Sequence, residues 1–266
     1  MNDVASALGR VGRSLRAAFT GGRRDHAKPS RVPEGALVYA IGDIHGRSDL
    51  LAALVARIEE DVQARAAAQR PIVVFVGDYV DRGSDSRGVI DLLLTGLPRG
   101  WDCHFLKGNH EEALLDFLGD PKFGEVWRDF GGLQTLTSYG VAILRQGAEI
   151  DWPATARAFA AAFPREHLDF LNNLRLHAAI GDYVFVHAGV RPRIPLEYQS
   201  ERDLLWIREE FTAAGRALPQ TVVYGHTPHE DVVVGPGRIG IDTGAYATGK
   251  LTAAGFHGAE VWYLST

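Results

Sequence analysis

The sequence predicts an α/β protein: a two-sheet β sandwich flanked by helices, with a helical insertion. Runs of strand-forming residues alternate with helical patterns between residues 37 and 106, which is typical of a largely parallel sheet with helices on its faces. More closely spaced strands return after residue 182 and indicate hairpins in a second sheet. The intervening stretch 111–177 is mostly helical in pattern and rich in Leu, Phe and Trp, so we expect it to form the insertion.

The first half supplies the parallel strands. The β-branched run Ile72–Val76 is typical of a strand buried on both faces. Ser48 is a suitable N-cap for a helix reaching about Gln69, with apolar residues on one face. A second helix is expected over residues 86–95. The strands expected in this half are Leu37–Ile41, Ile72–Val76 and Cys103–Leu106.

The second half supplies shorter strands and contains one misleading motif. Gly235–Gly240 matches G-x-G-x-x-G, but it contains Pro236 and runs into a strand, so we interpret it as a hairpin turn rather than a dinucleotide site. The strands expected here are Tyr183–Val186, Thr221–Tyr224, Val232–Val234, Arg238–Ile241 and Val261–Leu264.

Composition favours one large intracellular domain. The chain has 266 residues and a net charge of −5, which gives no general reason to expect nucleic acid as a partner. Its one cysteine, Cys103, cannot form an internal disulfide and is interpreted as a small core residue. No apolar run approaches the ~20 residues of a transmembrane helix. We therefore expect a cytoplasmic protein with no transmembrane segment.

The N-terminal residues 1–33 differ from the rest. They carry seven Lys and Arg against two Asp, with apolar residues at helical spacing. One interpretation is a basic amphipathic helix that touches an anionic membrane surface or a partner, and the other is a flexible tail. We predict a basic, flexible tail over 1–33 and a catalytic domain over 34–266.

Six short motifs carry the chemistry, and five directly follow a run of strand-forming residues. Asp, His and Asn at strand ends are oxygen and nitrogen ligands on rigid supports, as in hydrolytic metal pairs. The motifs are Gly42-Asp43-Ile44-His45-Gly46, Gly77-Asp78-Tyr79-Val80-Asp81-Arg82-Gly83, Gly108-Asn109-His110-Glu111, His187-Ala188-Gly189, Gly225-His226-Thr227-Pro228 and Ile241-Asp242-Thr243-Gly244.

These motifs offer a full set of ligands for two divalent metal ions. Two ions can activate water and clamp both sides of an in-line displacement, which requires about six ligands with one carboxylate between the ions. Mixed nitrogen and oxygen ligands suit Mn²⁺, with Fe, Zn or Co as alternatives, better than Ca²⁺. The candidate ligands are Asp43, His45, Asp78, Asn109, His187 and His226.

The ordered motifs resemble the phosphoprotein phosphatase group of the calcineurin-like metallophosphoesterases, and most of all its compact bacterial and phage serine/threonine phosphatases. The likeness runs from about Leu37 to Leu264. It implies a metallophosphoesterase fold and a bridging Asp78. The remaining ligands implied are Asp43, His45 and His226 for one metal ion, and Asn109 and His187 for the other.

The resemblance also implies the residues that act on the substrate. His110 would donate a proton to the leaving oxygen, oriented by Asp81, and a carboxylate partner is chemically suited to that task. Arg82 would bind the phosphoryl oxygens, and Arg208 matches a second phosphate-contacting arginine. Two further residues are expected near the site: Tyr246 at its mouth and Asp242 in a supporting turn.

The function implied is a phosphomonoester hydrolase that dephosphorylates phosphoserine and phosphothreonine in proteins or peptides by direct attack of a metal-bridging hydroxide. The alternative is a dinucleoside polyphosphate hydrolase, since relatives of that specificity share the metal motifs. Glu111 after His110, and Thr227-Pro228 after His226, favour the first. A scaffold without catalysis is disfavoured because the proton donor, its carboxylate partner and the phosphate-binding arginine are all present. The sequence does not give the oligomeric state.

Overall fold

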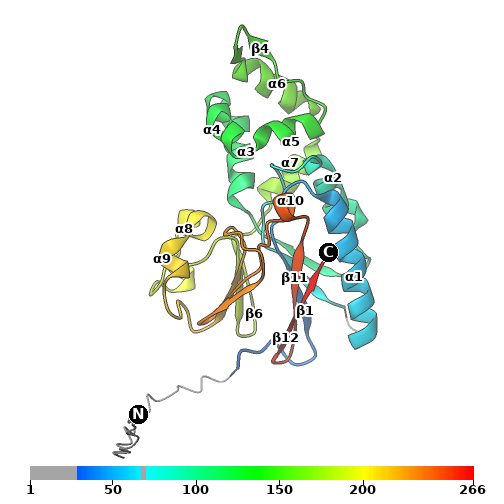
Figure 1. Cartoon of the computed structure of the whole chain (residues 1–266), viewed down its shortest axis with the longest axis vertical. Helices are drawn as coiled ribbons and strands as arrows, with labels where there is room; N and C mark the ends of the chain where they lie inside the picture. Colours follow the sequence, from blue (N-terminus) through cyan, green and yellow to red (C-terminus); the bar gives the residue numbers. More distant parts are fainter. Residues whose placement is uncertain (1–28, 67–69) are drawn as a thin grey trace, which may run out of the picture.

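The computed structural model describes residues 29–66 and 70–266, and these residues form a layered α/β sandwich (Figure 1). Two five-stranded sheets lie face to face in the described residues, and helices cover their outer faces. The predicted fold class is confirmed. Within the described ranges, none of the helices combines the length and the apolar character needed to cross a membrane. The N-terminal helix considered for the tail falls outside the described residues.

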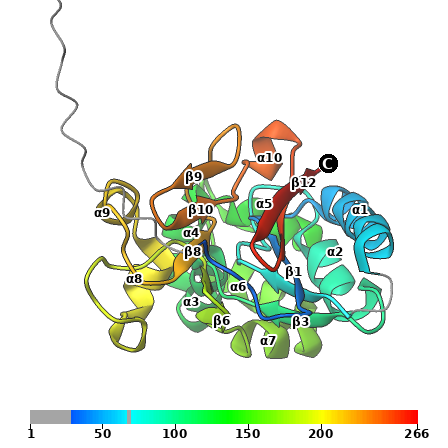
Figure 2. The same ribbon diagram turned by 90° about the horizontal axis from the view of Figure 1, so that it is seen from below.

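The first sheet contains the parallel strands expected from the first half of the chain. β1 pairs with β2 and β2 with β3 in parallel, and β11 joins the other edge of β1 in antiparallel orientation. Helices α1 (Ser48–Ala66) and α2 (Ser86–Asp91) lie on its outer side (Figure 2). In spatial order the strands are β12 (Glu260–Ser265), β11 (Thr252–His257), β1 (Leu37–Ile41), β2 (Ile72–Phe75) and β3 (Asp102–Phe105).

The alternation of side chains along β1 explains the layers. Leu37, Tyr39 and Ile41 belong to the cluster that includes the apolar face of α1, whereas Val38 and Ala40 belong to the core between the two sheets. Successive residues of a strand point to opposite faces, so β1 is buried on both. Full burial of a large aliphatic side chain contributes about 1.5–3 kcal/mol, so these two layers hold the sheet firmly in place.

The second sheet contains two hairpins joined through parallel pairings. β7, β8 and β10 run parallel, while β6 and β9 pair antiparallel at the edges. Helices α8 (Glu201–Trp206) and α9 (Glu209–Thr212) lie on its outer side (Figure 2), and the short turn η3 (Leu196–Tyr198) precedes them in the chain. The strands in order are β6 (His177–Ile180), β7 (Tyr183–Val186), β8 (Thr221–Tyr224), β10 (Arg238–Gly240) and β9 (Val233–Gly235). The predicted hairpin turn over the G-x-G-x-x-G motif is confirmed, because it joins β9 to β10.

The helical insertion projects beyond one end of the sandwich, at the top of Figure 1. It is helical as predicted, apart from one small β4–β5 hairpin. Its elements are α3 (Asn109–Gly119), η2 (Pro121–Phe123), α4 (Gly124–Asp129), α5 (Gly132–Ser138), β4 (Arg145–Gln146), β5 (Glu149–Ile150), α6 (Trp152–Ala162) and α7 (Arg165–Asn172).

The structure corrects the strand prediction in two respects. Strands β6 and β11 were not expected, because both are rich in alanine, which has low β propensity. The strand expected at Val261–Leu264 was placed in the second sheet, and this is wrong, since β12 pairs with β11 in the first. The Trp262 ring explains the placement: it packs edge-on against Tyr39 at 5.9 Å and lies under the guanidinium of Arg65 from α1.

Two segment boundaries also differ from expectation. The helix predicted over residues 86–95 is α2 followed by a π-helical turn, η1 (Leu92–Gly96). The last residues of the predicted tail pack on the body: Val32 is buried, and its amide donates to the Gly258 carbonyl at 3.0 Å. The carbonyl of Arg31 accepts from the Asp182 amide at 2.8 Å. The folded body therefore includes residues before position 34.

Candidate metal centre

The strands bring the six sequence motifs to one end of the sandwich, next to the insertion (Figure 1). In the first sheet the motifs directly follow β1, β2 and β3, which are parallel. In the second they follow β7, β8 and β10, which are also parallel. Because the carboxyl ends of parallel strands share one edge of a sheet, this topology gathers side chains that are distant in sequence. The ligand candidates consequently lie in one place.

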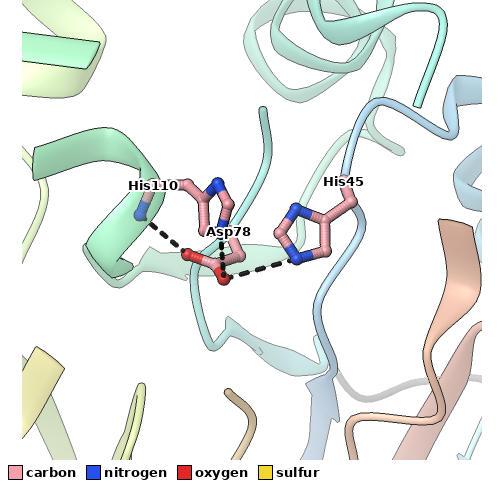
Figure 3. Close-up of side chains that lie close together, drawn as sticks. All are labelled: His45, Asp78 and His110. Carbon is pink, nitrogen blue, oxygen red and sulfur yellow. Dashed lines mark hydrogen bonds and ion pairs between the residues drawn. The ribbon is translucent and has the colours of Figure 1, made fainter. Parts of the chain in front are cut away.

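The Asp78 carboxylate lies at the centre of the site. Its Oδ2 is 3.4 Å from His45 Nε2, and 3.8 Å from His110 Nε2 (Figure 3). Its Oδ1 is 3.4 Å from His187 Nε2 on the opposite side. Two groups of possible ligand atoms share Asp78, one with His45 and His110 and one with His187 and His226, each group lying within 4.8 Å. This position suits a carboxylate shared between two ions.

The ligand histidines are oriented by the main chain. His45 Nδ1 lies 2.9 Å from the Val80 carbonyl, and His187 Nδ1 lies 3.0 Å from the Val76 carbonyl. A carbonyl accepts Nδ1–H, so each ring presents the lone pair of Nε2 to Asp78 and the centre of the site. Burial is the main cause that lowers the pKa of both histidines and of His226, whose pKa falls to about 2. Neutral imidazole is the form that binds a metal.

Two buried ligand atoms lack a hydrogen-bond partner, Asp43 Oδ1 and His226 Nε2. Buried polar atoms in proteins are nearly always hydrogen-bonded, so these two unpaired atoms indicate that a further group binds between them. Burial, followed by the charges of Asp242 and Asp78, raises the pKa of Asp43 well above its ordinary value. A divalent cation would offset this crowding of carboxylates. The donor set present here therefore fits a metal pair.

The glycines of the motifs leave room for these carboxylates. A Cβ on Gly225 would collide with Asp43 Oδ1, and a Cβ on Gly108 would collide with Asp78 Oδ1. The main chain can approach each carboxylate closely only because these positions have no side chain. This explains why glycine precedes the ligand in two of the motifs.

The ring of His226 lies beside that of His187. Its centroid is 5.0 Å from that of His187, and the His226 main-chain amide donates to Asp43 Oδ2 at 2.9 Å. The family resemblance implied that His226 shares a metal ion with Asp43 and His45, whereas in the structure its possible ligand atom lies within 4.8 Å of those of His187 and Asp78. Asn109 belongs to the same side, since its Oδ1 is 2.9 Å from His187 Nε2.

His110 and Asp81 form a buried pair beside the ligands. His110 Nδ1 donates to Asp81 Oδ2 at 2.8 Å, which leaves Nε2 directed toward Asp78 and the site. Burial alone would lower the pKa of His110, but the Asp78 carboxylate and the Asp81 hydrogen bond outweigh it and raise this pKa above its usual value. The arrangement can hold a proton on Nε2 and release it to a nearby oxygen.

The two predicted phosphate-binding arginines border the site. Arg82 Nη1 lies 2.9 Å from His45 Nε2, and its guanidinium lies 4.9 Å from the ring centroid of Tyr246. Tyr246 also packs edge-on against His45 at 5.4 Å and is 40% exposed, which agrees with a place at the mouth. Arg208 is exposed, and its Nη1 donates to the His226 carbonyl at 3.0 Å.

Unusual main-chain conformations are concentrated at this site. Positive φ angles outside glycine occur at six described residues, and five belong to the motifs. Such conformations cost energy and persist only where the surroundings enforce them. The five are His45 (46°), Asp78 (53°), Asp81 (70°), Arg82 (66°) and His226 (63°).

Sequence reasoning assigned no role to Glu111, although it lies in a motif. Its carboxylate is buried and accepts from main-chain amides of both the β2 and the β3 loops. Asp242 behaves as predicted, because its Oδ1 accepts from the Gly244 amide at 2.8 Å and closes a turn. Trp127 and Thr135 of the insertion also donate hydrogen bonds to the Asp81 carboxylate. Neither residue belongs to a recognisable sequence motif, so sequence reasoning missed both.

The chain resembles known proteins over most of its length. The sequence model described as calcineurin-like phosphoesterase matches residues 36–254. Serine/threonine-protein phosphatase 1 of Salmonella typhimurium is 30% identical over 222 residues, which cover 82% of this chain and 90% of that protein. The asymmetrical bis(5'-nucleosyl)-tetraphosphatase PrpE of Oceanobacillus iheyensis is 27% identical over 232 residues, which cover 81% of this chain and 87% of that protein.

Solved structures agree on the fold. A crystal structure of a candidate diadenosine tetraphosphatase superposes with a TM-score of 0.56 at 22% identity, covering 86% of this chain and 93% of the other. The match of the family model extends over most of the chain, from β1 into β11, and includes the segment that carries every candidate metal ligand. The chain therefore belongs to the calcineurin-like phosphoesterase family and is a metallophosphoesterase, a hydrolase of phosphate esters.

Proposed function

We propose that this metallophosphoesterase hydrolyses phosphomonoesters and that its substrates are phosphoserine and phosphothreonine residues of proteins. The proposal assigns the metal ligands to Asp43, His45, Asp78, Asn109, His187 and His226. Manganese is the preferred ion for this mixed set, with Fe, Zn or Co as alternatives, and the expected setting is cytoplasmic. When bound, the two ions neutralise phosphoryl charge and lower the pKa of bound water to about 7.

The side chains of the protein perform the remaining tasks. Arg82 and Arg208 border the site from two directions and bind the phosphoryl oxygens, which suits planar groups that stay charged. His110 Nε2 delivers a proton to the departing oxygen, and Asp81 accepts the Nδ1–H bond that orients the ring and stabilises its charged form.

The buried His110–Asp81 pair is the main observation that favours a phosphomonoester over a phosphoanhydride as the substrate. A serine or threonine leaves as a strongly basic alkoxide unless it is protonated, so cleavage of its phosphate ester gains much from a positioned acid. A nucleotide that leaves from a phosphoanhydride is a weaker base and gains less. The 2.8 Å contact between two side chains that are almost completely buried provides such an acid. The pair therefore supports a phosphomonoester as the substrate.

The surface beside the site has room for more than a phosphate group. A hollow of about 400 Å³ is lined by Arg82, Arg128, Phe130 and Tyr246, among others. A second hollow of about 490 Å³ is lined by Phe130 and Trp206, among others. Phe130 therefore borders both hollows, and its ring centroid is 5.7 Å from that of His110. Residues that flank a phosphoserine could occupy them.

A second candidate function is hydrolysis of dinucleoside tetraphosphates. The observation that favours it is the 27% identity to the bis(5'-nucleosyl)-tetraphosphatase of Oceanobacillus iheyensis over most of both chains. The metal ligands would serve either reaction, since in both water attacks a phosphorus atom and displaces a leaving oxygen. The two functions differ in the leaving group and in what the two hollows bind.

A direct comparison of substrates tests the proposal. The Mn²⁺-loaded chain is assayed on phosphoserine and phosphothreonine peptides and, side by side, on diadenosine tetraphosphate. We expect a higher kcat/KM on the peptides. Higher kcat/KM on diadenosine tetraphosphate would reject the protein phosphatase assignment and leave the metal site as described. A phosphotyrosine peptide included in the same series determines whether the hydroxyl amino acids are distinguished from tyrosine.

A further inference from the structure

The carboxylate of Asp81 receives more hydrogen bonds than its pairing with His110 requires. Its Oδ2 accepts from His110 Nδ1 at 2.8 Å and from the indole Nε1 of Trp127 at 3.0 Å. Its Oδ1 accepts from Thr135 Oγ1 at 2.6 Å. Asp81 is completely buried, and two of its three side-chain donors come from the helical insertion rather than from the motifs.

Thr135 holds the main chain of Asp81 as well as its side chain. The Asp81 amide donates to Thr135 Oγ1 at 2.9 Å and also lies 3.1 Å from Ser86 Oγ. The hydroxyl of Thr135 therefore accepts from the amide and donates to the carboxylate of the same residue. Asp81 has a φ of 70°, a conformation that an aspartate keeps only when its surroundings enforce it. Thr135, together with Ser86, supplies that enforcement.

The indole of Trp127 is itself held in place. It is completely buried and stacks on Phe117, with ring centroids 4.7 Å apart. A Cβ on Gly132 would collide with the indole, so α5 approaches this ring closely only because that position is glycine. A donor fixed in this way lets the Asp81 carboxylate adopt one orientation, and this orientation places the His110 ring.

We infer that Trp127 and Thr135 are positioning residues for the proton donor, so the helical insertion sets the orientation of His110 through Asp81. The inference rests on the proposed function, in which His110 protonates the leaving oxygen. Neither residue touches the ligands or the reacting atoms, and both act through one carboxylate. Removing either donor lets that carboxylate turn, and a proton donor displaced by a fraction of an ångström transfers its proton less efficiently.

Variants that remove one hydrogen bond at nearly constant shape test this inference. Trp127→Phe removes the indole N–H, and Thr135→Val removes the hydroxyl. Trp152→Phe is the matched control: this buried tryptophan of the insertion also contacts Phe117, but its Nε1 donates to Glu125. Thr135→Ser restores the hydroxyl and should recover the activity lost in Thr135→Val.

The first readout is the dependence of kcat on the leaving group. Phenyl phosphate releases a basic oxygen that needs a proton, and dinitrophenyl phosphate releases one that does not. We expect Trp127→Phe and Thr135→Val to lower kcat on phenyl phosphate about tenfold, with KM and metal content unchanged, and to alter kcat on dinitrophenyl phosphate little. An equal loss on both substrates would overturn the inference, as would a loss of the same size in Trp152→Phe.

The second readout is a double-mutant cycle. If Trp127 acts only through Asp81 and His110, then adding Trp127→Phe to His110→Asn should cause no further loss of kcat. The same tenfold loss in both backgrounds would mean a general structural role and overturn the inference. Thr135→Val provides the same cycle if Trp127→Phe does not fold.

His110→Asn alone separates this inference from the proposed function. If that variant also loses equal activity on both aryl phosphates, His110 is not the acid, and the two proposals fail together. If His110→Asn shows the leaving-group dependence and the two insertion variants behave as the wild type, the positioning role alone is overturned.

Discussion

The Glu111 carboxylate on α3 accepts a hydrogen bond from the main-chain amide of Asp78 at 2.9 Å. The same carboxylate accepts from the amides of Tyr79 and Val80 in the loop after β2, and from Gly108 in the loop after β3. One buried side chain thereby joins two loops at the centre of the metal site. Gly108 is the N-cap of α3, so its bond to Glu111 at position N3 also supports the start of the helix.

Glu111→Ala should destabilise both the fold and the metal site. It would leave four buried amides without an acceptor, and a buried unpaired donor costs about 1–3 kcal/mol. We expect the free energy of unfolding to fall by about 3 kcal/mol or more, with weaker metal binding, in urea unfolding and metal titrations. Glu112→Ala is the control, since the Glu112 side chain accepts one bond, from Trp206. Equal losses in the two variants would contradict the role given to Glu111.

Asp81→Asn should move the pH profile of kcat. If the protonated form of His110 is the donor, as proposed, kcat should fall as pH rises through the pKa of His110. Burial lowers this pKa, but the Asp78 carboxylate and the Asp81 hydrogen bond outweigh it and raise the pKa above its usual value, so Asp81 helps to set the position of the alkaline limb. Removing the Asp81 charge lowers this pKa, and the limb should shift to lower pH while kcat decreases. If the alkaline limb of the kcat profile stays at the same pH in Asp81→Asn, a group other than His110 titrates there.

Asp78→Asn should reduce the amount of bound metal. Asp78 lies between two groups of ligand atoms, and an amide offers one neutral oxygen where the carboxylate offers two charged ones. We expect less than full occupancy of two ions after dialysis, measured by plasma emission spectroscopy. Asp102→Asn, at an exposed carboxylate outside the site, should bind as much metal as the wild type. Full occupancy in Asp78→Asn would contradict its shared position.

Two N-terminal deletions should differ in effect. Removal of residues 1–28 should leave kcat on a small phosphate ester and the melting temperature unchanged. Removal of residues 1–33 also takes away Val32, which is buried and bonded to Gly258. Loss of a buried valine and its neighbouring main-chain bonds should lower the melting temperature by several degrees. A large loss of kcat in the shorter deletion would mean that the tail belongs to the catalytic domain.

The candidate metal ligands could be found in the sequence because each lies in a short motif after a strand. Asp43 follows β1 and Asp78 follows β2, and the hydrophobic runs that precede them are unambiguous. Strand β11 was missed because most of its side chains are small and weakly apolar. It has Gly255 at the position where the Trp262 ring needs room. Its place next to β1 depends on packing that local propensity does not record.

The supporting residues could not be predicted for a different reason. Trp127 and Thr135 lie 46 and 54 positions after Asp81, inside helices whose pattern indicates only a core. Glu111 was visible in its motif, but its partners are amides some 30 residues earlier, in a loop whose shape depends on positive φ angles. The side on which the His226 ring lies also follows from that three-dimensional arrangement.

The turnover of His110→Asn tests the central claim most directly. The metal-loaded variant and wild type are compared on one phosphoserine peptide, with metal content measured on the same samples. The account predicts a kcat roughly 10²–10⁴-fold lower, the usual contribution of a general acid, with metal content near that of the wild type. Wild-type turnover in a variant that retains both ions would contradict the assignment of His110 as the proton donor.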